Sequence, residues 1–438
     1  MPDQNAVRSL KERFQRATSS PPLMMLYPPV SGGRPFEGST EDLWRGVDAG
    51  EATLYVHVPF CRTRCIFCPF HATVAPPEDY GPYVDALLAE ASMHARHLEA
   101  CSFSSVYFGG GTPSVLPPDL LRRLLDGLRG RLRIDGADIS LEASPSTIDA
   151  GKLRALREAG VTRLSLGVQS FDAKALAGCG RDDRPADVLR SLDAALAAGF
   201  RDVNIDLMYG LPGQTLPAFL GDLRIAAGRA VPGVTLYAAV YLPALAQRAR
   251  DLGCEVPTED DKHEFYGAAY DFLTANGYPQ RHFGAGAFLR GGLNAHRRNV
   301  AHGAPTIGIG TWAYSSTGVR AWQNLAPREA WAETLGRGRP PIATVLEVDE
   351  EERPRKWAIE ALLLAFLDRR LFERRFGETV EARFPAELEA LLDLGLIEDA
   401  ADEIRLTREG GRHLREIRYV FASEKVVEAM ESGRLQGL

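Results

Sequence analysis

Three cysteines in one short segment are the residues of this sequence best suited to chemistry. Cys61, Cys65 and Cys68 lie in "YVHVPFCRTRCIFCPF" with the spacing C-x3-C-x2-C. The chain has 6 cysteines in all, and the other three are scattered, so a secreted disulfide framework is not expected. Four explanations compete for the cluster of three: a zinc site, a redox C-x2-C pair, a purely structural role, or an iron–sulfur cluster.

The spacing favours the iron–sulfur cluster. A structural zinc site needs a fourth ligand, and although His71 is near, no second C-x2-C or H-x3-H pair follows. A redox pair made by Cys65 and Cys68 would leave Cys61 idle. Three thiols so close together at the end of an apolar run rarely arise from packing alone. A four-iron cluster held by three thiolates keeps one iron open for a substrate or cofactor.

The elements around the cysteines predict a parallel sheet. From "TLYVHV" to "FYGAAYDFLTANG", strand-like and helix-like segments alternate in about six β-α units with short connections. Right-handed crossovers would curl these units into a partial (β/α)6 barrel, with the cysteines at the carboxyl end of the first strand. We therefore divide the chain into an irregular extension (1–50), the barrel (51–285), a connecting segment covering the barrel mouth (286–346), and a mostly helical, winged-helix-like domain (347–438).

Composition limits the expected binding partners and cellular location of the protein. The chain has 438 residues and a formal net charge of −7, so a general affinity for nucleic acid is not expected. No apolar run is long enough to span a membrane, and "MPDQNAVRSLKERF" lacks the apolar core of a secretory signal. We expect a cytoplasmic monomer that acts on a small-molecule substrate, without membrane or nucleic-acid partners.

The cysteine motif has an aromatic residue, Phe67, directly before the third cysteine, and in this it resembles the radical S-adenosylmethionine (radical SAM) superfamily. The resemblance implies a [4Fe–4S] cluster with one open iron that binds SAM. One electron from the reduced cluster then cleaves SAM to a 5′-deoxyadenosyl radical, so an electron donor such as flavodoxin or ferredoxin is expected as a partner.

Further segments resemble the oxygen-independent coproporphyrinogen III oxidase-like (HemN-like) family. They are "VYFGGGTPS", "RLSLGVQSFD" and "NIDLMYGLPGQT", with looser similarity in the tail. Glycines in the first segment let the backbone approach a ligand closely. The match implies SAM contacts from Tyr55, Phe67, Gly109, Gly110, Gly111, Thr112, Glu142, Gln169, Arg181 and Asp206. Glu142 and Asp206 could instead cap the turns that follow them, Tyr55 could be a packed strand residue, and the glycines could form only a turn.

HemN-like enzymes have space for a second SAM, so we expect two molecules. The matching stretches here make Met208, Ala239 and Val240 candidates for that site, although a role in the core is at least as good an explanation. Proton transfer needs a base, and the candidates are Tyr241, His282 and His296. A single histidine is more often structural.

At two positions the sequence differs from known members of the HemN-like family, and these differences determine which reaction we expect. Phe70 stands where the coproporphyrinogen oxidases have a further cysteine, and the stretch "NAHRRNVAHGAPTIGIGTW" lacks the Tyr-Trp pair typical of the family's heme chaperones. We therefore expect a class C methyltransferase or cyclopropanase that uses the second SAM as carbon donor for an sp2 carbon of a natural product. The alternatives are an anaerobic tetrapyrrole enzyme, either heme-degrading or a coproporphyrinogen III dehydrogenase, and a heme chaperone.

Overall fold

A computed structural model describes residues 2–19, 24, 26–47, 50–284 and 286–435 of the chain. Residue 285, the predicted boundary between barrel and connecting segment, lies outside the described residues. Within the described part, no helix is long and apolar enough to cross a membrane.

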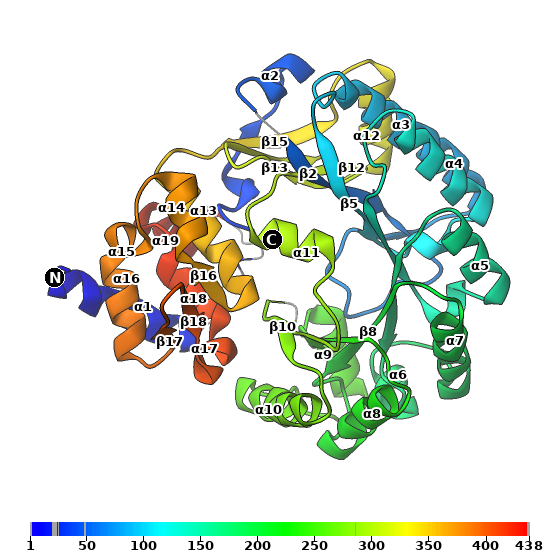
Figure 1. The fold of residues 1–438 in the computed structure, drawn as a ribbon. Coiled ribbons are helices and arrows are strands. Elements are labelled where there is room, and N and C mark those ends of the chain that lie inside the picture. Colours follow the sequence, from blue (N-terminus) through cyan, green and yellow to red (C-terminus); the bar gives the residue numbers. More distant parts are fainter. Residues whose placement is uncertain (1, 20–23, 25, 48–49, 285, 436–438) are drawn as a thin grey trace.

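An open barrel of six neighbouring parallel strands forms the centre of the molecule (Figure 1). The strands are β2 (Glu51–Val58), β5 (Ser102–Gly110), β6 (Asp138–Ala143), β7 (Arg163–Gln169), β8 (Asp202–Tyr209) and β9 (Gly233–Ala238). Helices cover the outside of this sheet: α3 (Tyr80–Ala95), α4 (Pro118–Arg129), α5 (Ala150–Glu158), α7 (Pro185–Ala197), α8 (Leu216–Gly228) and α10 (Glu259–Ala275). The predicted partial (β/α)6 barrel is therefore confirmed.

Alternation along each strand decides what lies inside the barrel. In β2, Leu54, Val56 and Val58 are fully buried under the outer helices, whereas Tyr55 and His57 point to the other side. In the other strands, the same alternation points polar side chains into the interior of the barrel. The interior of this barrel is thus a polar network rather than the layers of branched apolar residues usual in closed barrels.

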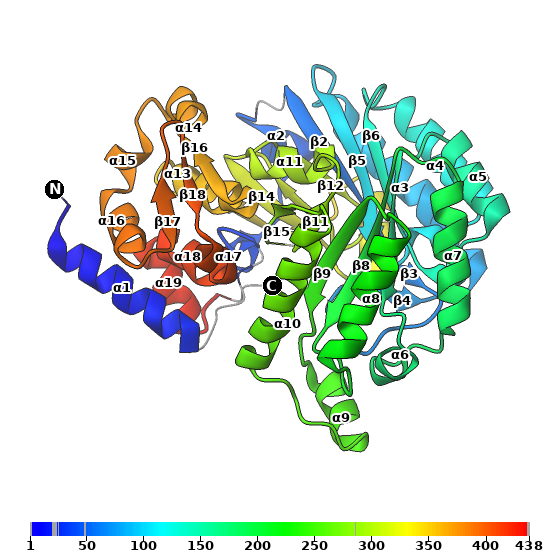
Figure 2. The ribbon, with the colours of Figure 1, turned by 60° about the horizontal axis from the view of Figure 1, so that its bottom comes forward.

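Short elements follow the strands at their carboxyl ends. They are β3 (Phe60–Cys61), β4 (Thr73–Val74), α6 (Ala173–Gly178), α9 (Pro243–Asp251), and the single-turn helices η2 (Pro77–Asp79), η3 (Pro113–Val115) and η4 (Pro145–Thr147). Figure 2 shows several of them gathered at one end of the sheet. This end is where parallel barrels place their active sites.

The connecting segment does more than cover the barrel. Its strands extend the sheet at both edges: β12 (Thr306–Ile309) pairs parallel with β2, and β11 (Ala287–Leu289) pairs antiparallel with β9. The short strand β10 (Gln280–His282) precedes the segment and pairs with β11, and the segment's remaining elements are α11 (Ala295–Ala301), β13 (Tyr314–Ser316), β14 (Arg320–Asn324), α12 (Arg328–Gly336) and β15 (Ile342–Glu347). Helix α11 packs against β2 and β5 and lies in the middle of the ring in Figure 1.

The C-terminal domain has its own core beside the open side of the barrel. A three-stranded sheet, with order β16 (Phe366–Asp368), β18 (Glu403–Leu406), β17 (Ile397–Asp399), packs among short helices. These are α13 (Glu352–Ala361), η5 (Leu362–Leu364), α14 (Arg369–Phe376), α15 (Val380–Arg383), α16 (Pro385–Asp393), α17 (Arg408–Arg412), α18 (Leu414–Phe421) and α19 (Glu424–Glu431). The predicted helical domain with a small winged sheet is confirmed.

The N-terminal extension differs from the irregular structure expected. It contains the 16-residue helix α1 (Gln4–Ser19), followed by η1 (Val30–Gly32), β1 (Arg34–Pro35) and α2 (Thr40–Trp44). Val7, Leu10, Phe14 and Ala17 form a buried stripe on α1, and the helix packs on α16 and α18 (Figure 2). Because these apolar residues are sparse in a strongly polar segment, their helical spacing was not recognised from the sequence.

Candidate functional site

The three motif cysteines lie on one loop at the carboxyl end of the first barrel strand. Cys61 ends β3, and the loop tightens where the Cys68 amide donates to the Cys65 carbonyl at 3.2 Å. All three thiols are partly exposed. Burial raises the pKa of Cys61 and of Cys68, and the charge of another cysteine of the motif adds to each shift.

The glycine-rich stretch after β5 is held against this loop. Gly110 has φ +113°, and a Cβ atom there would lie 2.6 Å from the His57 ring. A Cβ on Gly111 would lie 2.7 Å from the carbonyl of Pro59. The Thr112 hydroxyl then reaches to 3.5 Å from the Cys61 sulfur. Close packing against β2 therefore already requires two of these glycines, whereas the expectation had been approach to a ligand.

Two carboxylates lie inside the barrel, Glu142 near the carboxyl end of β6 and Asp206 in the middle of β8. Glu142 accepts a 2.7 Å hydrogen bond from the Tyr107 hydroxyl, and Asp206 accepts one of 2.9 Å from Asn204. Burial raises the pKa of both groups, to about 7 for Glu142, and the charge of Asp206 adds to the shift of Glu142. Carboxylates with few partners and raised pKa values are suited to bind the polar groups of a ligand.

Two arginines join elements of the site, and the charge of one of them, Arg297, acts on both carboxylates. Arg181 donates to the Gly167 carbonyl at 2.6 Å and lies 3.4 Å from the Ser144 hydroxyl, so it joins the ends of β6 and β7. Arg297, on α11, donates to the Tyr237 hydroxyl at 3.2 Å. The sequence analysis missed Arg297, although its neighbour in the chain, His296, was a candidate.

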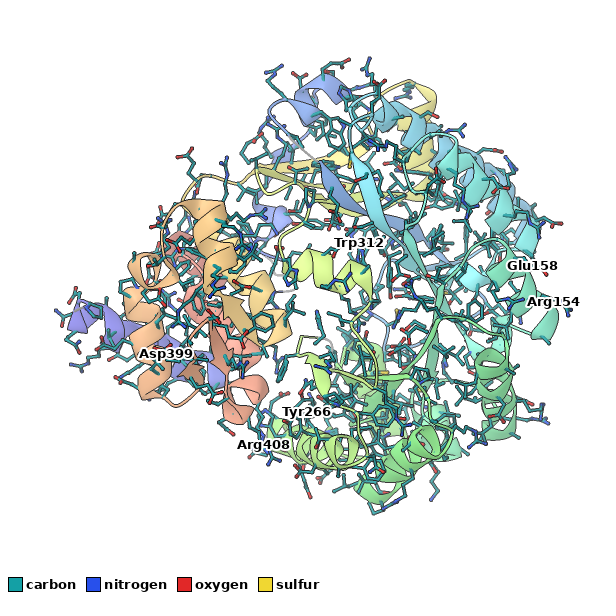
Figure 3. All side chains as sticks on the ribbon, in the orientation of Figure 1. Arg154, Glu158, Tyr266, Trp312, Asp399 and Arg408 are labelled. Carbon is teal, nitrogen blue, oxygen red and sulfur yellow. The ribbon has the colours of Figure 1, made fainter. Side chains whose placement is uncertain are left out.

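A cavity of about 550 Å³ lies between the barrel, α11 and the C-terminal domain. From the barrel it is lined by Tyr55 and His57, and its aromatic walls are Phe70, Trp312, Tyr314, Trp357 and Phe376. Three cationic residues also line it: Arg353, Lys356 and Arg375. Figure 3 labels Trp312 close to α11, near the centre of the molecule. This volume is in the range of sites for small organic ligands.

Comparison with known proteins decides the family. Residues 55–224 match the Radical SAM superfamily and residues 348–413 match the HemN C-terminal domain. The heme chaperone HemW of Mycobacterium tuberculosis is 32% identical over 365 residues, which are 82% of this chain and 91% of that protein. The chain belongs to the HemN-like family of radical SAM proteins.

Other relatives support this assignment. The oxygen-independent coproporphyrinogen III oxidase of Pseudomonas aeruginosa is 30% identical over 395 residues, covering 84% of this chain and 85% of that one. The anaerobilin synthase of Escherichia coli is 29% identical over 312 residues, with 69% of each chain covered. The solved structure of coproporphyrinogen III oxidase (HemN) from Escherichia coli matches with a TM-score of 0.77 and 25% identity, covering 88% of this chain and 94% of that one.

Radical SAM proteins use a [4Fe–4S] cluster and SAM, and the cysteine loop fits such a cluster. Within the described ranges, no three His, Cys, Asp or Glu side chains gather tightly enough for a single metal ion. In a [4Fe–4S] cluster each thiolate binds a different iron, so the three cysteines need not converge on one point.

Three of the predicted SAM residues lie on neighbouring strands, and their binding role stays a prediction. Glu142 and Gln169 lie at the carboxyl ends of β6 and β7, and Asp206 lies three residues before the end of β8; the strands pair in that order. Gln169 has φ +69°, a left-handed conformation uncommon outside glycine. Phe67 packs against a small apolar group beside the cysteine loop that includes Met208, Ala239, Cys179 and Leu245.

The candidates for a second SAM site and for a base lie in different surroundings. Met208 and Ala239 are buried in that apolar group, whereas Val240 is 46% exposed. The Tyr241 hydroxyl donates to the Gly210 carbonyl at 3.0 Å. His296 lines the cavity, but His282 lies on the edge strand β10 and is not among the lining residues. A second SAM site at these positions stays a prediction.

Proposed function

We propose that this HemN-like protein is a radical SAM enzyme that acts on a tetrapyrrole bearing carboxylate side chains, such as heme. The observation that carries the proposal is the cavity, whose aromatic walls suit a flat apolar macrocycle and whose cationic residues suit its carboxylates. The relatives point the same way, since those named above are a heme chaperone, an anaerobilin synthase and a coproporphyrinogen oxidase. They do not support the expected methylation or cyclopropanation of a natural product.

Arg353 and Arg375 are the cationic residues of the cavity best suited to bind an anion, because Lys356 already pairs with Glu360, which also lines the cavity. Lys356 is buried and pairs with Glu360, and Arg375 donates to the Gly303 carbonyl at 2.9 Å. Burial lowers the pKa of the Arg375 guanidinium, and Glu360 only partly opposes this shift. Arg375 remains exposed where it lines the cavity, and a ligand carboxylate there would form a charge-assisted ion pair with it.

A [4Fe–4S] cluster held by Cys61, Cys65 and Cys68, together with SAM, would supply radical chemistry at this site. The chain's own residues hold the substrate within reach of that site. Tyr55 and His57 belong to the strand that leads into the cysteine loop and also line the cavity. The cavity therefore begins where the cluster loop begins, and substrate bound there lies beside the radical source.

His296 is the better placed of the two histidine candidates for proton transfer. Its ring stacks on Tyr107 with centroids 4.9 Å apart, and its Nδ1 atom is buried without a hydrogen-bond partner among the described residues. Burial lowers its pKa to about 4, with Arg297 adding to the shift, so the ring is neutral at physiological pH. A neutral imidazole can accept or relay a proton of the substrate.

The test is anaerobic turnover of the reconstituted protein with hemin and, separately, with coproporphyrinogen III. We expect a tetrapyrrole product of altered mass together with 5′-deoxyadenosine. Stoichiometric hemin binding without SAM consumption would instead indicate a chaperone. If neither compound binds or reacts, the tetrapyrrole proposal is wrong.

A further inference from the structure

The backbone of Trp312 is strained, and its position is unusual for such strain. Among the described residues, the non-glycine residues with positive φ are Gln169, Ala230, Trp312 and Ala365. Ala230 follows α8, and Ala365 caps η5, so both end helical segments, where this conformation is common. Trp312 ends no helix, and at φ +59° it is a bulky residue in a region that favours glycine.

Hydrogen bonds to its backbone amides hold the turn that carries Trp312 in place. The Gly310 amide donates to the Glu90 carboxyl at 2.7 Å, and the Thr311 amide donates to the Tyr83 hydroxyl at 3.1 Å. The Trp312 amide donates to the Leu325 carbonyl at 2.9 Å. Three consecutive amides thus have partners on two different segments, helix α3 and the residue that follows β14. Strained conformations persist where the surroundings determine them in this way, and they concentrate at ligand sites.

The indole of Trp312 joins the cluster loop to the cavity. Its ring centroid lies 6.2 Å from that of His57 and 6.0 Å from that of His71, three residues after the last motif cysteine. The side chain is only partly buried, and it lines the cavity together with Phe70. The imidazole rings support the indole, and the remaining surface is available to a ligand.

We propose that Trp312 is a specificity-determining residue whose indole forms the stacking wall for the flat macrocycle. This inference rests on the proposed function, because it concerns the same cavity. Aromatic stacking needs a fixed ring plane, and the strained, fully hydrogen-bonded turn supplies one at the end of the cavity nearest the cluster loop. The position of the macrocycle relative to the radical source would then depend on this residue.

The test uses the full-length, cluster-reconstituted protein and follows hemin binding by its absorption. W312G should weaken hemin binding about tenfold or more, because the stack is lost. Its melting temperature should equal or exceed that of the parent, because glycine relieves the positive φ. The matched control A230G also places glycine at a positive φ, but outside the cavity, and should leave hemin affinity unchanged.

A second pair of variants keeps the test decisive if W312G folds poorly. W312F keeps a ring and should bind hemin within a few-fold of the parent, whereas W312L keeps apolar volume without a ring and should bind like W312G. If W312G or W312L binds hemin as tightly as the parent, the inference about Trp312 is wrong while the tetrapyrrole proposal stands. If the parent protein binds neither hemin nor coproporphyrinogen III, the proposed function fails; if it binds only coproporphyrinogen III, the same variants are compared with that tetrapyrrole.

Discussion

Phe70 and Trp312 lie more than two hundred residues apart in the sequence and line the same cavity. Phe70 follows the last motif cysteine by two positions and is 44% exposed. The loop that holds the cysteines therefore also supplies part of the wall of the cavity. This relationship gives a physical reason for an aromatic residue at a position where coproporphyrinogen oxidases have a further cysteine.

The first prediction concerns Phe70. Replacing it by alanine should leave the iron and sulfide content of the reconstituted protein unchanged, because its side chain is not a thiolate ligand. Hemin binding should weaken several-fold, because an aromatic wall is lost. Absorption titration and iron analysis of Phe70→Ala measure both. Loss of iron would show that Phe70 supports the cluster rather than the cavity.

The second prediction concerns the cluster ligands. Cys65→Ala should lose the brown colour, most of the iron, and SAM cleavage, because two thiolates hold a cluster poorly. The barrel should remain folded by circular dichroism. Cys101→Ala is the matched control, since Cys101 lies just before β5, at the opposite end of the strand from the motif loop. Equal iron content in both variants would contradict the assignment of the motif.

The third prediction concerns the cationic end of the cavity. Arg375→Gln should weaken binding of protoporphyrin IX about tenfold, because a charge-assisted pair with a carboxylate is lost. The dimethyl ester of the same porphyrin should bind both forms equally. The neighbouring Arg374 is exposed and does not line the cavity, so Arg374→Gln is the control. A similar loss for acid and ester would exclude carboxylate recognition by Arg375.

The fourth prediction concerns Glu90, which holds the Trp312 turn. Burial raises its pKa to about 8, although donors from Gly310, Asn324 and Trp331 act against this shift. The folded state therefore binds the proton more tightly than the unfolded state. The stability from this group is present below about pH 4.5 and is lost as the pH rises through 8.

Urea unfolding at pH 5 and pH 8 measures this dependence. The free energy of unfolding should fall between the two values in the parent, and the fall should be smaller in Glu90→Gln, which cannot ionise. Glu99→Gln is the control, because Glu99 is exposed and follows the helix that carries Glu90. This variant should retain the parent's dependence of stability on pH. If Glu90→Gln also retains it, Glu90 is ionised in the folded protein.

Much of the fold and of the cluster loop could be predicted because their signals are local. Cys61, Cys65 and Cys68 lie within eight positions, and the βα rhythm recurs along the chain. The glycine-rich stretch was recognised for the same reason. Its main physical cause, close packing of Gly110 against His57, was not, since that contact joins two strands.

The cavity could not be predicted, because its walls come from segments that meet only in the folded chain. Trp312 follows a glycine-rich stretch, and Arg375 belongs to a helix of another domain, so neither has a pattern that indicates a site. The helix α1 was missed because its apolar stripe is sparse, and its burial depends on α16 and α18. Without the cavity, the sequence favoured natural-product methylation over a tetrapyrrole.

The most direct test of the central claim is the rate of 5′-deoxyadenosine release by the reduced, cluster-reconstituted protein with SAM. The rate is measured with and without hemin, with Cys65→Ala as the blank. A radical SAM enzyme that acts on a tetrapyrrole should release 5′-deoxyadenosine faster with hemin, in proportion to the tetrapyrrole consumed. If hemin leaves the rate unchanged and is recovered intact, while labelled methyl groups from SAM enter another substrate, the account is contradicted.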